Sequence, residues 1–65
     1  MISVNTREQP WREGLNVQSL LDEMGFIFRH IIVRINGEYV PEEAYSARLI
    51  ADGDDVQVLH LIAGG

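Results

Sequence analysis

The stretch NVQSLLDEMG, residues 16–25, predicts the one clear helix of this chain. Asn16 is a favourable N-cap, because its side-chain oxygen can accept a hydrogen bond from an early helical N–H. Leu15 can pack on Leu20 as a hydrophobic staple, and Gly25 supplies a left-handed stop. A helix of about two turns does not persist alone in water, so it must be held by a sheet. The apolar residues of the stretch recur at the spacing of a single helix face: Val17, Leu20, Leu21 and Met24.

Before the helix, the alternation of apolar and polar residues over 2–5 predicts a half-buried strand. Residues 6–8 are expected to form a turn, and residues 9–12 a return strand. Pro10 would restrict that strand to a sheet edge or make it the first strand residue. Trp11 is interpreted as a packed or half-packed aromatic rather than as a ligand-stacking residue.

After the helix, residues 26–28 are expected to connect over the edge of the core. The β-branched run 31–35 predicts an interior strand. Asn36-Gly37 predicts a two-residue hairpin turn in which both residues have positive φ. The return strand then covers residues 38–40 and ends at Pro41.

Residues 42–51 are expected to hold a short helical turn and a short strand around residues 48–50. A turn is expected at 52–54. Residues 56–61 predict the last strand. One amphipathic helix among these strands packs most economically across one sheet face, with the last strand parallel to the first. The expected fold is therefore α+β, a β-grasp (ubiquitin-like) domain over residues 1–61 with four to five strands, followed by a flexible tail at 62–65.

Composition excludes several classes of function. The chain has 65 residues, enough for one domain, and no cysteine, so disulfides, thiolate metal sites and thiol nucleophiles are excluded. Ten carboxylates oppose five arginines for a net charge of −5, which disfavours nucleic acid. The acidity fits either a basic partner surface or simple solubility. No run approaches the ~20 apolar residues of a membrane span, so a cytoplasmic protein is expected.

Catalytic and ligand-binding patterns are weak. His30 and His60 have no carboxylate at metal-ligand spacing. His60 is close enough to the C-terminus to feel a partner's active site, although a surface or rim histidine is the favoured interpretation. Residues 52–54 resemble part of a calcium loop without its other ligands. No phosphate-binding glycine loop is present, so we expect the chain itself to hold no metal, ATP or other cofactor.

The C-terminal segment Ile62-Ala63-Gly64-Gly65 favours a different role. Two glycines without β-carbons can pass through a narrow slot and place the last carbonyl in a partner's catalytic site. The Gly65 carboxylate is ionised at neutral pH and is a poor electrophile, so acyl chemistry would require activation, for example by adenylation. The five residues 61–65 reach about 17 Å when extended.

The last strand carries apolar residues on both faces. If Val56 and Val58 point toward the helix, then Leu59 and Leu61 lie on the open face of the sheet. Leucines on an open face beside a functional tail indicate a docking patch, and the alternative is scattered surface leucines without a role.

Three segments, namely 35–37 with 40–41, 52–54 and 62–65, give the chain a resemblance to the ThiS family, the small sulfur carriers of thiamin thiazole biosynthesis. The resemblance implies a carrier that is a substrate and not an enzyme. Gly65 would be adenylated by a ThiF-like adenylyltransferase that uses ATP and magnesium. Sulfur from cysteine, delivered by a desulfurase or sulfurtransferase, would give a thiocarboxylate that thiazole synthase consumes. Gly64, Ala63 and Ile62 would thread the tail into these partners.

Alternatives remain open at this point. Within the fold, the sulfur could serve molybdopterin or another sulfur-containing metabolite. A protein modifier joined to lysines of its targets is the alternative of another class. The chain has no lysine, which speaks mildly against a modifier that builds chains on itself. An interaction module with an inert tail is the third alternative.

Overall fold

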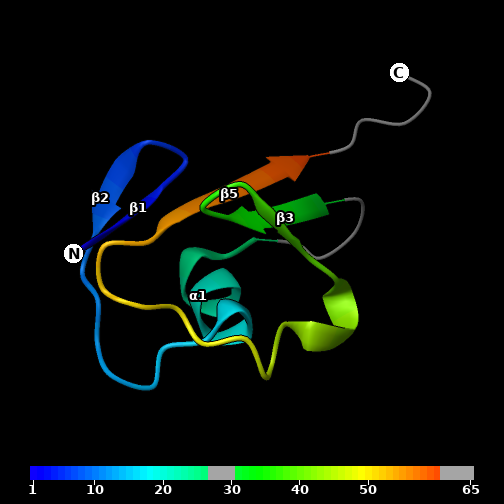
Figure 1. Cartoon of the computed structure of the whole chain (residues 1–65), viewed down its shortest axis with the longest axis horizontal. Coiled ribbons are helices and arrows are strands. Elements are labelled where there is room, and N and C mark those ends of the chain that lie inside the picture. The colour runs from blue at the N-terminus through cyan, green and yellow to red at the C-terminus, as the bar shows by residue number, and fades with distance from the viewer. Residues whose placement is uncertain (27–30, 61–65) are drawn as a thin grey trace.

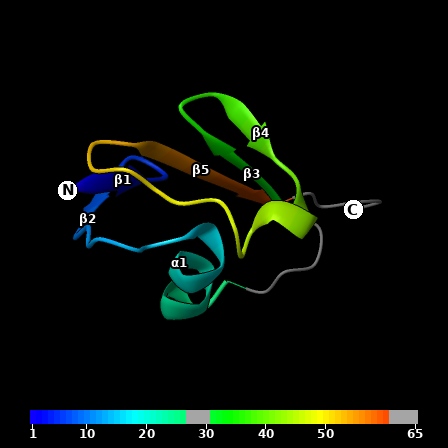
Figure 2. The same ribbon diagram turned by 60° about the horizontal axis from the view of Figure 1, so that its bottom comes forward.

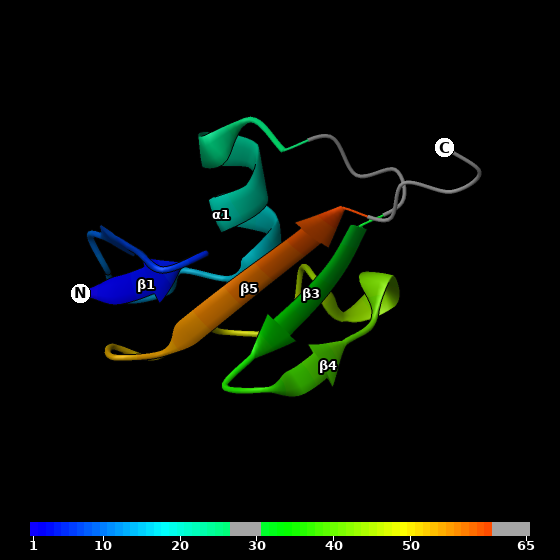
Figure 3. The ribbon, with the colours of Figure 1, turned by 90° about the horizontal axis from the view of Figure 1, so that it is seen from above.

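The computed structural model describes residues 1–26 and 31–60, which form a five-stranded mixed sheet and one α-helix (Figure 1). The strands lie side by side in the order β2-β1-β5-β3-β4, four of which are labelled in Figure 3. This is the expected β-grasp arrangement. The elements are β1 (Ile2–Val4), β2 (Arg7–Gln9), α1 (Val17–Met24), β3 (Ile31–Ile35), β4 (Glu38–Val40), the 3₁₀ turn η1 (Glu42–Ala44) and β5 (Asp55–His60).

Helix α1 lies against one face of the sheet, as Figure 2 shows. The apolar side chains that strands and helix direct toward each other form a single core, and no buried polar side chain occurs in the described part of the chain. Burying this shared apolar surface is what stabilises the short helix. The core residues are Ile2, Val4, Leu15, Val17, Leu20, Leu21, Val33, Ile35, Val40, Tyr45, Ile50, Val56 and Val58.

The predicted helix is confirmed together with its caps. The Asn16 side chain accepts from the Ser19 N–H at 2.7 Å, and Gly25 adopts φ 75° at the C-terminus. Met24 is 36% exposed and therefore lies at the margin of the apolar face. Trp11 is half-buried, and its indole N–H donates to the Ile50 carbonyl at 2.6 Å, so the packed interpretation is confirmed.

The parallel pairing of first and last strands is also confirmed, with Val4 opposite Val56. The Asn36-Gly37 turn has φ 53° and 84°, as its sequence predicts. Val33 pairs with Val40 on β4 and with Val58 on β5, so β3 is an interior strand.

The predicted course of the first hairpin is wrong. The turn lies at Asn5-Thr6, with φ 51° and 72°, and not at residues 6–8. The return strand is Arg7–Gln9 rather than 9–12. Asparagine tolerates the left-handed region, so the chain turns one residue earlier than expected. Pro10 follows the strand, where its lack of an N–H does no harm.

The segment 42–51 fits the prediction in part. Its helical turn is confirmed at η1, but the strand around residues 48–50 is wrong. Only a single bridge joins Asn16 to Leu49 there. The Ile50 N–H donates to the Leu15 carbonyl at 2.8 Å. This loop contact satisfies the buried Ile50 N–H, which would otherwise need a partner in a neighbouring strand.

The expected connection at 26–28 falls mostly outside the described residues, which include only Phe26, packed against the core. In the described part of the chain, no helix has the length and apolar character that crossing a membrane requires.

Candidate functional site

Strand β5 leads into the C-terminal segment and divides its side chains between the two faces of the sheet. Val56 and Val58 point toward α1 and are 0% and 3% exposed, as predicted. Leu59 points to the opposite face and is 42% exposed. The alternation along the strand therefore carries one large apolar side chain to the surface next to the tail.

Leu59 has an apolar neighbour on the open face. It lies opposite Ile32 of β3, whose side chain is half-buried. Further along this face, Arg34 lies opposite both Tyr39 of β4 and Gln57 of β5, and Tyr39 is 60% exposed. We call Ile32, Tyr39 and Leu59 the open-face patch. Apolar side chains exposed together on one sheet face are typical of interaction surfaces, so the open-face patch is a candidate docking site.

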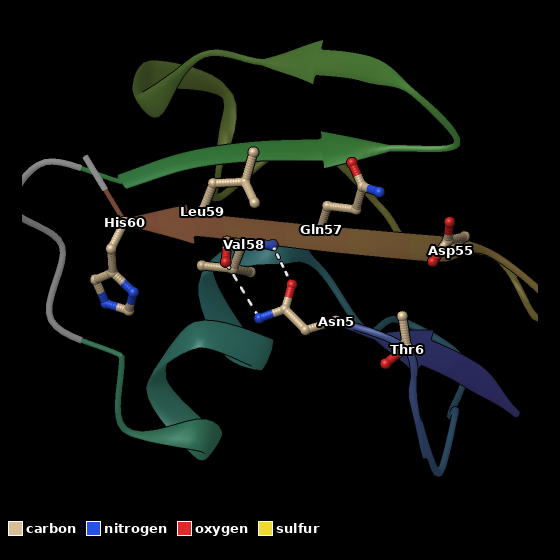
Figure 4. Close-up of a pocket in the computed structure, with 7 residues that line it drawn as sticks. All are labelled: Asn5, Thr6, Asp55, Gln57, Val58, Leu59 and His60. Atoms are coloured by element: carbon tan, nitrogen blue, oxygen red, sulfur yellow. Dashed lines mark hydrogen bonds between the residues drawn. The ribbon is translucent and has the colours of Figure 1, made fainter. Parts of the chain in front are cut away.

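A groove runs along the edge of β5 that faces β1, past the point where β1 ends. Asn5 closes it from the β1 side: its amide donates from Nδ2 to the Val58 carbonyl at 3.1 Å, and Oδ1 accepts from the Val58 N–H at 2.8 Å (Figure 4). The groove has a volume of ≈ 380 Å³ and is lined by Asn5, Thr6, Asp55, Gln57, Val58, Leu59 and His60.

Asn5 is a functional candidate of the groove that the sequence did not reveal. Its bonds to Val58 join residues 53 positions apart, so no local sequence pattern predicts them. The available signal was an asparagine directly after an alternating strand, which is a common left-handed turn residue.

His60 lies at the end of β5, exposed and tilted against Phe26 with ring centroids 5.9 Å apart. The expected surface position is confirmed. Its contact links the last described residue of the C-terminal strand to the segment that follows α1.

The described residues give little support to an independent catalytic or metal centre. No group of three or more metal-ligating side chains occurs among residues 1–26 and 31–60. The Arg12 guanidinium lowers the pKa of Glu23 through a hydrogen bond, but the pair is exposed on the helix side. Burial raises the pKa of Tyr45, which belongs to the core. These shifts come from ordinary structural contacts.

Several predicted site residues lie outside the described residues. They are the C-terminal positions Leu61, Ile62, Ala63, Gly64 and Gly65; His30, which was not a predicted site residue, also lies outside the described residues. The boundary between domain and tail at 61/62 therefore stays a prediction, as do the roles of these residues. Of the predicted docking pair, the structure locates Leu59 on the open face.

The model of one protein family, described as the ThiS family, matches residues 2–65. The chain belongs to the ThiS family. The match includes the diglycine and nearly all of the domain. A protein of Porphyra purpurea, uncharacterized protein ycf40, is 30% identical over 98% of this chain and 93% of its own length.

Solved ThiS structures share the fold. The crystal structure of the thiamine biosynthesis protein ThiS from Geobacter metallireducens has a TM-score of 0.81 and 31% identity, covering 98% of this chain and 97% of that one. A solution structure of a thiamine biosynthesis protein from the same organism has a TM-score of 0.76 and 33% identity, covering 98% and 86%.

A longer relative also contains a ThiS-like part. The thiazole synthase of Paramagnetospirillum magneticum is 32% identical over 62 residues, which is 95% of this chain. The chain spans only 19% of the length of that relative.

Proposed function

We propose that this ThiS-family chain is a sulfur carrier of thiamin biosynthesis, and that the Gly65 carboxylate is the group that carries the sulfur. The observation that carries this proposal is the family match, which runs from residue 2 through Gly65 itself. The position of Leu59 at the end of β5 supports it, since docking there would bring the tail to the same partner.

The chemistry begins with activation. A carboxylate oxygen of Gly65 attacks the α-phosphorus of ATP and releases pyrophosphate, which turns a poor electrophile into an acyl adenylate. The terminal sulfur of a persulfide on a desulfurase or sulfurtransferase then attacks the carbonyl carbon and displaces AMP. A thiol cleaves the resulting acyl disulfide by disulfide exchange, which releases the thiocarboxylate and leaves a disulfide between the thiol and the sulfur donor. The terminal thiocarboxylate donates its sulfur to the thiazole. ATP and magnesium are bound by the ThiF-like partner, and a cytoplasmic location fits this use of ATP.

Thiazole synthase is the proposed consumer of the sulfur. A relative of that name contains a stretch similar to almost all of this chain, which supports a functional link between carrier and synthase. A pull-down with the tail intact should retain thiazole synthase. Retention of a molybdopterin-synthase large subunit instead would favour sulfur transfer to molybdopterin.

The direct test removes Gly65. The deletion should abolish ATP–pyrophosphate exchange catalysed by the ThiF-like enzyme, because the acceptor carboxylate no longer reaches the nucleotide. Glu23→Gln, on the helix side, is the matched control and should leave exchange unchanged. Exchange that persists at the normal rate after the deletion would refute activation of the tail.

A further inference from the structure

The outer edge of β5, which faces away from β3, can be followed residue by residue. The Asn36 N–H donates to the Asp55 carbonyl at 2.8 Å, which starts the ladder between β3 and β5. In an antiparallel ladder the main-chain groups alternate between the two sides of the strand. Gln57 and Leu59 therefore bond toward β3, whereas Val58 and His60 present their N–H and C=O to the opposite side.

Strand β1 pairs with this outer edge over only part of its length. The Asn5 N–H donates to the Val56 carbonyl at 2.9 Å, and the chain then turns away at Asn5-Thr6. At Val58 the Asn5 side-chain amide takes over, with one donor and one acceptor bonded to the N–H and C=O of a single residue. A primary amide offers the same groups as a peptide unit. The side chain thus imitates the next residue of a neighbouring strand.

His60 is the next residue on the same edge. Within residues 1–26 and 31–60, no turn or loop backbone group and no side chain bonds to its main-chain N–H or C=O. The groove of ≈ 380 Å³ lies along this part of β5, and its lining includes both Val58 and His60. Edge groups that, as here, have no partner in the described part of the chain are a template for an added strand.

We propose that this groove is a strand-addition site, where an extended segment of a partner protein forms main-chain hydrogen bonds with Val58 and His60 and replaces the Asn5 amide at Val58. The alternating donors and acceptors of the edge are met by an extended polypeptide. Asp55 in the groove and the net charge of −5 favour a neutral or basic segment.

The partner that this geometry fits is an enzyme that takes up the tail, so the inference rests on the proposed function. The groove and the tail share the end of β5, and a strand added at His60 would fix the direction in which the following residues leave the domain. Exchange at Val58 is balanced, because two bonds to Asn5 are replaced by two bonds to the segment. The bonds at His60 are the net gain.

Amide exchange of the ¹⁵N-labelled full chain, free and bound to the ThiF-like enzyme, tests the proposal. The His60 amide should exchange rapidly in the free chain and at least about tenfold more slowly in the complex. The Gln57 and Leu59 amides, which already bond toward β3, serve as internal controls and should change little. A His60 amide that is already protected in the free chain, or unprotected in the complex, would overturn strand addition.

Asn5→Gly tests whether the Asn5 amide is displaced by the partner segment or only stabilises the domain. Glycine keeps the positive φ of residue 5, so the turn itself is preserved. The free variant should show faster exchange at Val58, yet bind the enzyme at least as tightly as the wild type because no amide must be displaced. Weaker binding by the variant contradicts the proposal. For the wild-type chain, normal pyrophosphate exchange together with a His60 amide that stays unprotected in the complex would refute strand addition alone. Failure of the wild-type chain to bind the ThiF-like enzyme would refute the proposed function as well.

Discussion

The two ends of β5 are held differently, although each uses an asparagine in the left-handed conformation. At the start, Asn36 Oδ1 accepts from the Asp55 N–H at 2.9 Å, and its Nδ2 donates to the Asp54 carboxylate at 3.0 Å. At the end, Asn5 makes both of its side-chain bonds to Val58. The φ values of the two asparagines, 53° and 51°, are nearly the same.

The surroundings of the two asparagines explain the difference. Near the start, the Met1 ammonium pairs with Asp52 at 2.5 Å, and the Gly53 N–H donates to the Met1 carbonyl at 2.9 Å. Near the end, the Asn5 amide borders the groove, whose lining includes Leu59 of the open-face patch. The domain is thus anchored where β5 begins and presents binding surface where β5 ends.

The largest expected effect is on partner binding at the end of β5. Leu59→Asp should weaken binding of the ThiF-like enzyme by about 2 kcal/mol or more, since it places a charge in the centre of an apolar contact. Titration calorimetry measures the loss. Leu49→Asp is the matched control, an exposed leucine outside the groove and the open-face patch, and should cost far less. Equal affinities for Leu59→Asp and wild type would remove the docking role of the open-face patch.

The next effect concerns stability at the start of β5. Asn36→Gly keeps the positive φ but removes two side-chain hydrogen bonds, one of them to a carboxylate. We expect the free energy of unfolding to fall by about 2 kcal/mol, measured by urea denaturation. Binding of the ThiF-like enzyme to the folded variant should be unchanged. A loss below that of Asn5→Gly would contradict the assignment of the anchor to this end.

A smaller loss is expected for the corresponding change at the end of β5. Asn5→Gly removes two neutral hydrogen bonds and should lower the free energy of unfolding by about 1 kcal/mol. The same urea series measures it beside Asn36→Gly. Local exchange should rise at Val58 and not at Asp55. A uniform rise along β5 would show that its two ends are not independent.

The smallest effect is expected away from both ends, at the exposed Arg12–Glu23 pair. The hydrogen bond to Arg12 holds the pKa of Glu23 below its usual value of 4.5. The stabilisation is therefore present above about pH 4.5 and is lost as the pH falls through the lowered pKa. Glu23→Gln should be slightly less stable than wild type at neutral pH and equal to it in strong acid, by urea midpoints. A difference that grows toward acid pH would reverse the assigned sign.

The contrast between the two asparagines also shows what the sequence could predict. Asn36-Gly37 is a local turn signal, and the helix has a cap at each end, so both were predicted correctly. Asn5 has no glycine beside it, and its partner Val58 is 53 positions away. The turn of the first hairpin was therefore predicted at the wrong residues, and the groove beside Asn5 was not predicted.

Leu59 illustrates the intermediate case, in which one residue depends on both a local and a global pattern. Alternation along β5 gave its face, and the single helix left that face open, so its exposure was predicted. The strand predicted at residues 48–50 was wrong because the local pattern was overridden by a long-range contact. Their composition suits a strand, but Ile50 bonds to the backbone of Leu15 in a loop, and only the folded chain brings these two together.

Intact-mass analysis of the chain from its native host, grown under thiamin starvation, tests the central claim most directly. We predict a species heavier than the unmodified chain by the replacement of one oxygen with sulfur, located at Gly65 by fragmentation and absent from the Gly65 deletion. A chain that never gains this sulfur, although thiazole is being made, would contradict the assignment of this protein as the carrier.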